Sequence, residues 1–141
     1  MRLFSQDTKV ATLKRTPLFR ELSRKELEQL AKASEDMEFP AGKVLCRQGD
    51  VGREFFAIVE GEVEVTRSGE TIEPTGGGDF FGEIALIEKV PRTATVTAKT
   101  PLRAFVLTRQ AFQHLLDANP EIERKVLRAL AKRVASLAET R

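Results

Sequence analysis

Residues 81–96 read FGEIALIEKVPRTATV, and this ordered stretch predicts a binding site more specifically than any other part of the chain. Gly82 precedes a short apolar turn of helix expected at residues 84–87, and Arg92 follows that turn. A helix that begins after a glycine presents unpaired backbone N–H groups, and its peptide dipoles add partial positive charge there. Arg92 adds a planar, permanently charged fork of donors that binds two oxygens of one phosphate. The stretch therefore predicts capture of a phosphate group.

Glu83 indicates a second part of the expected ligand. A carboxylate repels a bare phosphate, so Glu83 needs a ligand that also carries a hydrogen-bond donor, and a sugar hydroxyl fits. Arginine for phosphate, carboxylate for ribose and a helical turn between them describe a pocket for a nucleotide whose phosphate is folded back near its own ribose. A Gly-Glu pair or a single arginine is common in proteins, so the prediction depends on their order and spacing.

The same stretch resembles the phosphate-binding cassette of cyclic nucleotide-binding domains, the family that includes the bacterial catabolite activator protein, the regulatory subunits of cyclic AMP-dependent kinase and cyclic nucleotide-gated channels. Three further segments resemble the strand and turn pattern of this family: PAGKVLCRQGD at residues 40–50, FFAIVEGEVEV at 55–65 and GGGDFFGE at 76–83. The resemblance covers about residues 16–138. It implies a regulatory or sensor module in which ligand binding moves the C-terminal helix.

The resemblance also implies a role for each cassette residue. Glu83 is expected to bind the ribose 2′-hydroxyl, and Arg92 the exocyclic phosphate oxygens. The other expected ligand-binding residues, which surround ribose and phosphate, are Gly82, Ile84, Ala85, Thr93 and Ala94. The resemblance implies neither a cofactor nor a metal, and the expected ligand is cyclic AMP or cyclic GMP.

Cyclic AMP is the favoured ligand, although two observations bear on the base. Thr93, a hydroxyl after the cassette arginine, resembles cyclic GMP-binding members, yet bacterial members with Ser or Thr there bind cyclic AMP. In the catabolite activator protein, hydroxyl side chains of the long helix contact adenine; aligning on Asn119-Pro120 places Leu137 and Ala138 at those positions. Leu137, together with Val134, is therefore expected to cover the base by apolar contact.

The remaining pattern predicts a mainly β fold with flanking helices (α+β). Ser23 and Glu26 form a capping-box sequence at the start of a helix over about residues 24–34. Residues 1–15 are expected to be an N-terminal extension, loose over 1–8, with a helix from residue 9 that ends near Pro17. The domain is expected to span 16–141.

Short alternating segments with glycine turns predict an antiparallel sandwich or roll over about 37–107, and the family implies an eight-stranded, jelly-roll-like β-roll. Strands are expected at 38–39, 43–47, 54–59, 62–67, 71–74, 93–98 and 102–107.

Two helices are expected to close the chain, over residues 109–118 and 120–140, divided by Asn119-Pro120. The long helix carries two apolar stripes: Ile122, Val126, Leu130, Val134 and Leu137 form one, and Leu127, Ala131 and Ala138 the other. Both stripes pack on the domain's own core, or one packs against the same helix of a second subunit, as in dimeric family members. The basic pairs Arg124-Lys125 and Lys132-Arg133 are expected on a solvated helix face.

Composition narrows the function classes. The chain has 141 residues and a net charge of +2, so one domain is expected and no global charge favours nucleic acid or membrane. One cysteine, Cys46, is expected in the core, and the absence of a signal-like segment favours a cytoplasmic protein. A DNA-binding regulator would need a helix-turn-helix after the long helix, so the chain alone is expected not to bind nucleic acid, although it could be the sensor half of a longer regulator. A ligand-free dimerisation module and an enzyme are less favoured alternatives, because the cassette residues are present and no base or metal site accompanies them.

Overall fold

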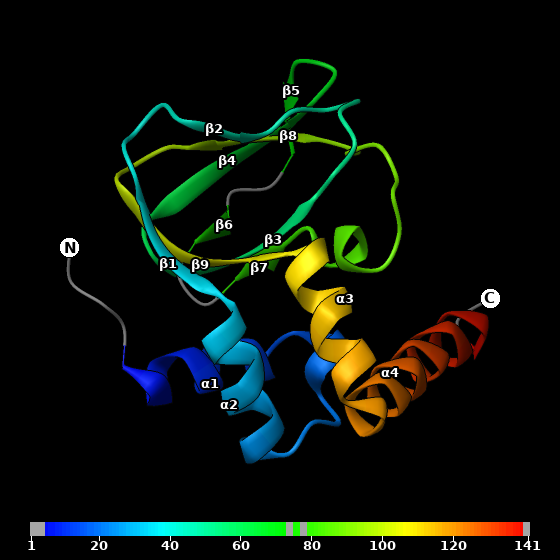
Figure 1. The fold of residues 1–141 in the computed structure, drawn as a ribbon. Coiled ribbons are helices and arrows are strands. Elements are labelled where there is room, and N and C mark those ends of the chain that lie inside the picture. Colours follow the sequence, from blue (N-terminus) through cyan, green and yellow to red (C-terminus); the bar gives the residue numbers. More distant parts are fainter. Residues whose placement is uncertain (1–4, 73–74, 77–78, 140–141) are drawn as a thin grey trace.

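The computed structural model describes residues 5–72, 75–76 and 79–139, which form two stacked antiparallel sheets with helices gathered at one end (Figure 1). The first sheet has the order β1-β9-β3-β7 and comprises β1 (Glu35–Phe39), β9 (Leu102–Thr108), β3 (Glu54–Glu60) and β7 (Phe80–Phe81). The second has the order β2-β8-β4-β5 and comprises β2 (Val44–Cys46), β8 (Thr95–Ala98), β4 (Glu62–Arg67) and β5 (Glu70–Thr71), with β6 (Thr75–Gly76) also paired to β4. The predicted β-roll with flanking helices is confirmed.

The elements β5 and β6 pair with opposite ends of β4. Thr71 lies opposite Thr66 and Gly76 lies opposite Glu62, so the two elements continue one strand along β4. Counted that way, the described residues form a roll of eight strands. Gly69 has a φ of +85°, as the predicted tight turn between β4 and β5 requires. The strand predicted at 71–74 falls partly on 73–74, which lie outside the described residues.

Two apolar clusters lie on opposite sides of the first sheet. Phe56 and Ile58 of β3 face the second sheet, where they join Val63 and Val96. The neighbouring Phe55 faces the helices, and its ring lies 5.7 Å from that of Phe19. Alternate side chains of one strand therefore fill both layers.

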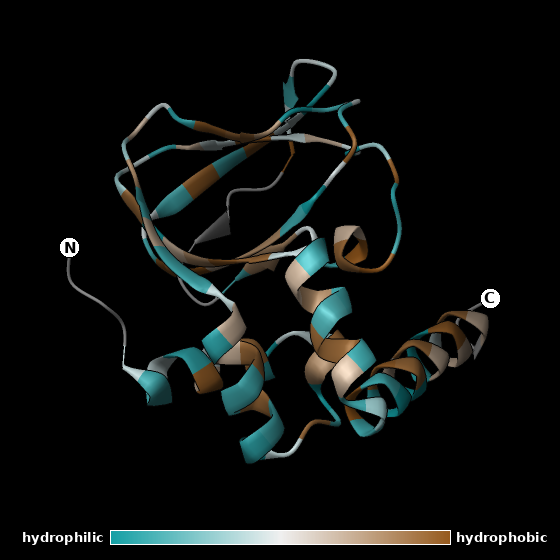
Figure 2. Cartoon of the chain, viewed as in Figure 1, coloured by the Kyte–Doolittle hydropathy of each residue, from teal (hydrophilic) through white to brown (hydrophobic). Residues whose placement is uncertain are grey.

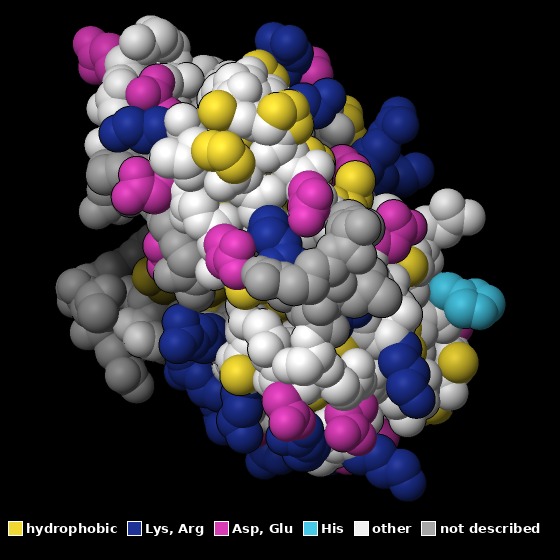
Figure 3. Space-filling model, turned by 90° about the vertical axis from the view of Figure 1, so that its left-hand side faces the viewer, with side chains coloured by type: hydrophobic (Ala, Val, Ile, Leu, Met, Phe, Trp, Pro, Cys, Tyr) yellow, Lys and Arg dark blue, Asp and Glu magenta, His cyan; other side chains and the backbone are white. Residues whose placement is uncertain are grey.

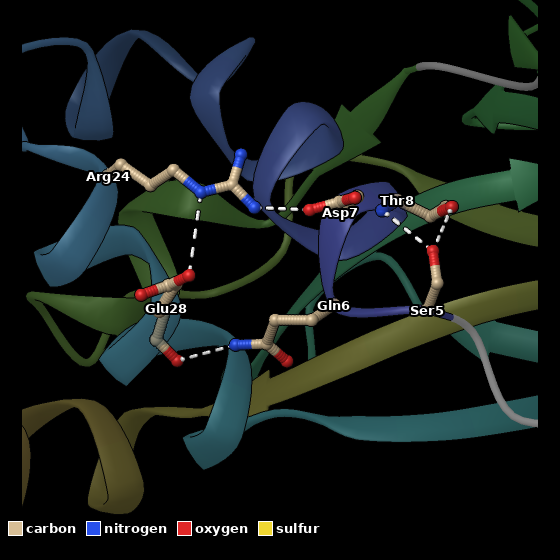
Figure 4. A network of polar contacts seen from close by, with 6 residues as sticks. All are labelled: Ser5, Gln6, Asp7, Thr8, Arg24 and Glu28. Carbon is tan, nitrogen blue, oxygen red and sulfur yellow. Dashed lines mark hydrogen bonds and ion pairs between the residues drawn. The ribbon is translucent and has the colours of Figure 1, made fainter.

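The N-terminal helices pack together under the roll. They are α1 (Gln6–Lys14), the 3₁₀ turn η1 (Pro17–Phe19) and α2 (Arg24–Ala33). The predicted capping box is present, because Ser23 Oγ accepts from the Glu26 amide and the Glu26 side chain accepts from the Ser23 amide. Arg24 of α2 also pairs with Asp7 and, at 3.4 Å, with Glu28 (Figure 4).

The first helix begins earlier than the sequence led us to expect. Ser5 caps it, accepting from the Thr8 amide at 3.1 Å (Figure 4), so the prediction that residues 5–8 are loose is wrong. The helix ends at Lys14, before Pro17, and it supplies Val10 and Leu13 to the core. The boundary between extension and domain at residue 16 stays a prediction, although α1 packs directly on the domain.

The C-terminal helices α3 (Arg109–Ala118) and α4 (Pro120–Glu139) follow β9. Among the described residues, buried side chains anchor α4 only in its first half, through Ile122, Val126 and Ala129. From residue 131 to 138 every side chain is exposed, and α4 extends beyond the body of the domain (Figure 1). Brown bands persist along this projecting part (Figure 2), where Val134 and Leu137 are 66% and 67% exposed.

Charged side chains of both signs are interspersed over the face shown in Figure 3. This agrees with the near balance of 23 basic and 21 acidic residues. No described helix is long and apolar enough to cross a membrane.

Candidate functional site

The cassette is built around a short 3₁₀ helix, η2 (Glu83–Leu86), so the turn of helix expected at 84–87 is present and begins one residue earlier. Gly82 caps η2 with a φ of +85°, a conformation that favours glycine. Ala85 and Leu86 are buried and anchor the turn to the core. Gln113 of α3 donates to the Leu86 carbonyl at 3.1 Å, which ties the end of the cassette helix to α3.

Arg92 is held in a slot between two glycines. A Cβ atom at Gly52 would lie 2.8 Å from Arg92 Cζ, and one at Gly82 would lie 2.7 Å from Arg92 Nη1. Arg92 Nη2 donates to the Glu54 carbonyl at 2.8 Å. The guanidinium is therefore positioned by backbone and retains further N–H donors for a ligand.

Backbone hydrogen bonds fix the segment that carries Arg92. The Arg92 amide donates to the Asp50 carbonyl at 2.7 Å, and the Gly49 amide donates to the Arg92 carbonyl at 2.9 Å. The Gly52 amide donates to the Val90 carbonyl at 3.1 Å. The loop at residues 49–52 thus sets the position of the arginine.

A cavity of about 410 Å³ lies between the cassette and the second sheet. All seven ligand-binding residues predicted from the sequence line it: Gly82, Glu83, Ile84, Ala85, Arg92, Thr93 and Ala94. Side chains of the sheet form the opposite wall, namely Cys46, Val65, Arg67 and Val96. The volume lies within the range of small-molecule pockets.

Glu83 presents one carboxylate oxygen that has no partner. Its Oε1 is 2.5 Å from Nη1 of Arg133 in α4. Its Oε2 is buried and has no hydrogen-bond partner among the described residues. A buried acceptor without a donor is costly, so this oxygen is suited to receive a ligand hydroxyl.

The basic residues of α4 also form ion pairs. Arg124, Lys132 and Arg133 are exposed, as expected for a solvated helix face, and in addition Lys132 pairs with Glu21 at 3.1 Å and Arg133 pairs with Glu83. Lys125 likewise lies 2.7 Å from Glu26 of α2. These basic groups are exposed in part yet connect α4 to the rest of the domain.

The expected base lid is not assembled at the cavity. Val134 is exposed, and Leu137 lines a separate cavity of about 270 Å³ between α4 and the segment that contains Pro17 and Glu21. The lid role of both residues stays a prediction. The amide of Ala85, which is expected among the residues around ribose and phosphate, donates to the Gly82 carbonyl at 3.1 Å.

Cys46 is a buried core residue, as predicted, and it also lines the cavity. Burial raises the pKa of its thiol to about 11, although the charge of Arg92 acts in the opposite direction. The Cys46 thiol beside the cassette arginine is therefore uncharged at neutral pH.

A profile of the cyclic nucleotide-binding domain matches residues 36–119, which include the whole cassette and its supporting loop. The chain belongs to the cyclic nucleotide-binding domain family. It is a regulatory domain of that family, which is not a family of catalytic domains.

The curated relatives of this chain are longer proteins of different kinds. A cyclic nucleotide-gated potassium channel of Rhizobium etli is 40% identical over 117 residues, which are 83% of this chain and 33% of the channel. A cAMP-dependent protein kinase regulatory subunit of Eremothecium gossypii is 40% identical over 113 residues, which are 79% of this chain and 25% of the subunit. This chain therefore spans a quarter to a third of the length of these curated relatives.

Among solved structures, the N-terminal domain of a transcriptional regulator from Streptomyces coelicolor superposes with a TM-score of 0.84. It is 28% identical, and the match covers 92% of this chain and 94% of that one. The chain thus has the same architecture as the N-terminal domain of a transcriptional regulator.

Three site features were missed from the sequence. Gly52 lies far from the cassette in sequence, and nothing local marks it as half of the Arg92 slot. Arg133 reaches Glu83 across 50 positions, so no spacing rule connects them. Arg67 lines the cavity because of strand register, which the alternation of β4 could have indicated.

Proposed function

We propose that this domain is a sensor that binds cyclic AMP in preference to cyclic GMP and couples binding to movement of α4. The observation that carries the proposal is that Glu83 lines the same cavity as Arg92 and has a buried Oε2 without a hydrogen-bond partner among the described residues. An acceptor for a ribose hydroxyl and a fork of donors for a phosphate are thereby brought to one site. The preference for cyclic AMP is supported by relatives named as cAMP-dependent kinase regulatory subunits.

The ion pair between Glu83 and Arg133 is the physical basis proposed for coupling. A ribose hydroxyl that donates to Oε2 leaves Oε1 available to Arg133, so ligand and helix share one carboxylate. Movement of α4 toward the cavity would then bury Val134 and Leu137 on the base, at about 1.5–3 kcal/mol for each side chain fully buried. The ligand therefore favours the closed position of α4 only because it gains contacts there.

Calorimetric titration with cyclic AMP, cyclic GMP and 5′-AMP tests the sensor function. We expect both cyclic forms to bind more tightly than 5′-AMP, with cyclic AMP the tighter. Arg92→Ala should remove most of the affinity without unfolding the domain, because charge-assisted hydrogen bonds contribute about 1.5–3 kcal/mol each. A folded parent protein that binds no cyclic nucleotide would contradict the proposal.

Self-association through α4 is a proposed part of this function. Leu127, Val134 and Leu137 are spaced by seven and three residues and are all more than 60% exposed, as in the seam of a coiled coil. Leu127→Glu should lower the mass measured by sedimentation equilibrium from two chains to one, with little change in thermal stability. A parent protein that sediments as a single chain at high concentration would refute self-association.

A second candidate is the sensor half of a longer transcriptional regulator. It is favoured by the match to the Streptomyces coelicolor domain, which covers nearly all of both chains. In that case α4 would continue toward a DNA-binding unit, and nucleotide binding would be transmitted through the same helix. DNA binding by the full-length gene product, measured with and without cyclic AMP, tests this role. Binding that changes with cyclic AMP supports it.

A further inference from the structure

Arg67 is the one basic side chain on the sheet wall of the cavity, among the residues that the structure describes. It is the last residue of β4, two positions after the lining residue Val65, and side chains two apart in a strand share a face. Val65 pairs with Val96 and Thr66 with Thr95, so the register continues to place Arg67 opposite Ala94, which also lines the cavity. Strand geometry therefore directs this cation toward the ligand space.

A hydrogen bond to the cassette orients the Arg67 guanidinium. Its Nε donates to the Thr93 carbonyl at 3.0 Å. This contact uses one of the five N–H donors of arginine and leaves the two terminal nitrogens as a planar pair. Arg67 is thus held beside Thr93, where its remaining N–H groups can donate hydrogen bonds to a ligand and it has no group that can accept one.

The position of the other groups indicates which part of a nucleotide meets Arg67. Arg92 and Glu83 take phosphate and ribose in the proposed function, so the base must occupy the remaining space along the sheet wall. Val65 and Val96 form an apolar surface there, which contacts the face of any base without discrimination. The edge of the base is then the part that Arg67 can contact.

Purines differ at this edge. Guanine and hypoxanthine present two acceptors, O6 and N7, whereas adenine presents N7 beside an N6 amino group that is itself a donor. A guanidinium makes two parallel hydrogen bonds to the first pattern and meets a donor in the second. We propose that Arg67 is a specificity-determining residue that recognises the O6/N7 edge of 6-oxo purines.

This inference rests on the proposed function and refines it. The apolar surfaces of the site accept either base, and Arg67 shifts the ratio of affinities toward cyclic GMP and cyclic IMP. It therefore limits the preference for cyclic AMP, and its removal should widen that preference. The ratio of affinities is expected to change about fivefold or more. This is the lower end of the discrimination expected of a bidentate contact, because Arg67 is exposed.

The test measures dissociation constants of cyclic AMP, cyclic IMP and cyclic GMP for the parent protein, Arg67→Ala and Arg67→Lys. Cyclic IMP differs from cyclic AMP in carrying O6 in place of the N6 amino group and a proton on N1, and it lacks the 2-amino group of guanine. Arg67→Ala should weaken cyclic IMP and cyclic GMP about fivefold or more relative to cyclic AMP. Arg67→Lys should lose most of the same discrimination, because it keeps the charge but not the fork.

Arg47→Ala is the matched control, because Arg47 is also exposed and near Cys46 but does not line this cavity. It should leave the three affinities in their parental ratio. In the parent protein, 7-deaza cyclic GMP should bind more weakly than cyclic GMP, and this difference should vanish in Arg67→Ala. The comparison of cyclic GMP with its 7-deaza analogue can be made on the parent protein alone if Arg67→Ala fails to fold.

The outcomes separate the inference from the proposed function. A parent protein that binds no cyclic nucleotide overturns both. Binding by the parent, with all three nucleotides weakened equally in Arg67→Ala, shows that Arg67 acts on phosphate and overturns base recognition alone. An equal change of ratio in Arg47→Ala would assign the effect to general charge and overturn it as well.

Discussion

Gly52→Ala should weaken nucleotide binding although Gly52 is not expected to touch the ligand. The new Cβ would lie 2.8 Å from Arg92 Cζ and 3.0 Å from Ala85 Cβ. Carbon atoms normally approach no closer than about 3.5–4.0 Å, so the guanidinium must move by about 0.7–1.2 Å. Since Arg92 Nη2 is 2.8 Å from the Glu54 carbonyl, such a shift would break or stretch the hydrogen bond that positions it.

The expected loss of affinity follows from these contacts. If displacement removes about half to two thirds of a charge-assisted interaction with phosphate, the loss is about 1–2 kcal/mol, or about 5- to 30-fold in Kd. The fold should survive, because the shortest contacts are to the guanidinium end of a flexible side chain and Ala85 Cβ, at 3.0 Å, has to give by only a few tenths of an ångström. Calorimetric titration with cyclic AMP measures the affinity, and thermal unfolding measures the stability.

Two comparisons make the result specific. Gly42→Ala, in a turn whose residues do not line the cavity, strains a residue at φ +90° but meets no atom within 4 Å, so it should lower stability and leave affinity unchanged. Gly52→Ala introduced into Arg92→Ala should have no further effect on binding, because the arginine it displaces is absent. If Gly52→Ala binds cyclic AMP within twofold of the parent while Arg92→Ala binds poorly, the glycine slot does not position the arginine for binding.

Three other perturbations have defined outcomes. Glu83→Gln should weaken cyclic AMP and remove its advantage over 2′-deoxy cyclic AMP in titrations; an advantage that persists would show that Glu83 does not bind the ribose hydroxyl. Burial raises the pKa of Glu26, but hydrogen bonds from Lys125 and Ser23 outweigh it, so the pKa lies below its ordinary value. The stability from Glu26 is therefore present above pH about 4.5 and lost as pH falls through the lowered pKa, so the thermal midpoint of Glu26→Gln should fall less steeply in acid than that of the parent. Cys46, with its pKa raised to about 11, should react with a thiol reagent at pH 8 at least about 100-fold more slowly than the unfolded chain, and fast labelling of the native protein would contradict its burial.

Local rules were sufficient for most of the fold. Ser23 and Glu26 are three residues apart, and both hydrogen bonds of the predicted capping box are present. The strands predicted to begin at Glu54 and Glu62 begin there, because Gly61 and alternating side chains punctuate them. The cassette was predicted as a unit because its residues lie within one short stretch, and they do line one cavity.

Interactions between distant segments were not predictable in this way. The start of α1 had a readable signal, since serine is a favoured N-cap, but Ser5 is followed by a mainly polar turn that resembles a loose terminus. The Arg133 to Glu83 pair had no local signal, because it depends on how α4 packs against η1. The slot for Arg92 needed the approach of two glycines from different loops, which only the folded chain brings together.

The packing around Arg92 has an entropic consequence. A free arginine side chain has about 2 kcal/mol of rotamer freedom to lose, and a binding site that orders it on ligand contact loses that affinity. Here the side chain is confined between Gly52 and Gly82 and bonded to the Glu54 carbonyl before any ligand contact. The freedom is lost when the domain folds, so the phosphate half of the site meets its ligand as a rigid receptor. In the proposed function the adaptable half is α4, whose exposed distal side chains gain contacts only when the helix moves toward the cavity.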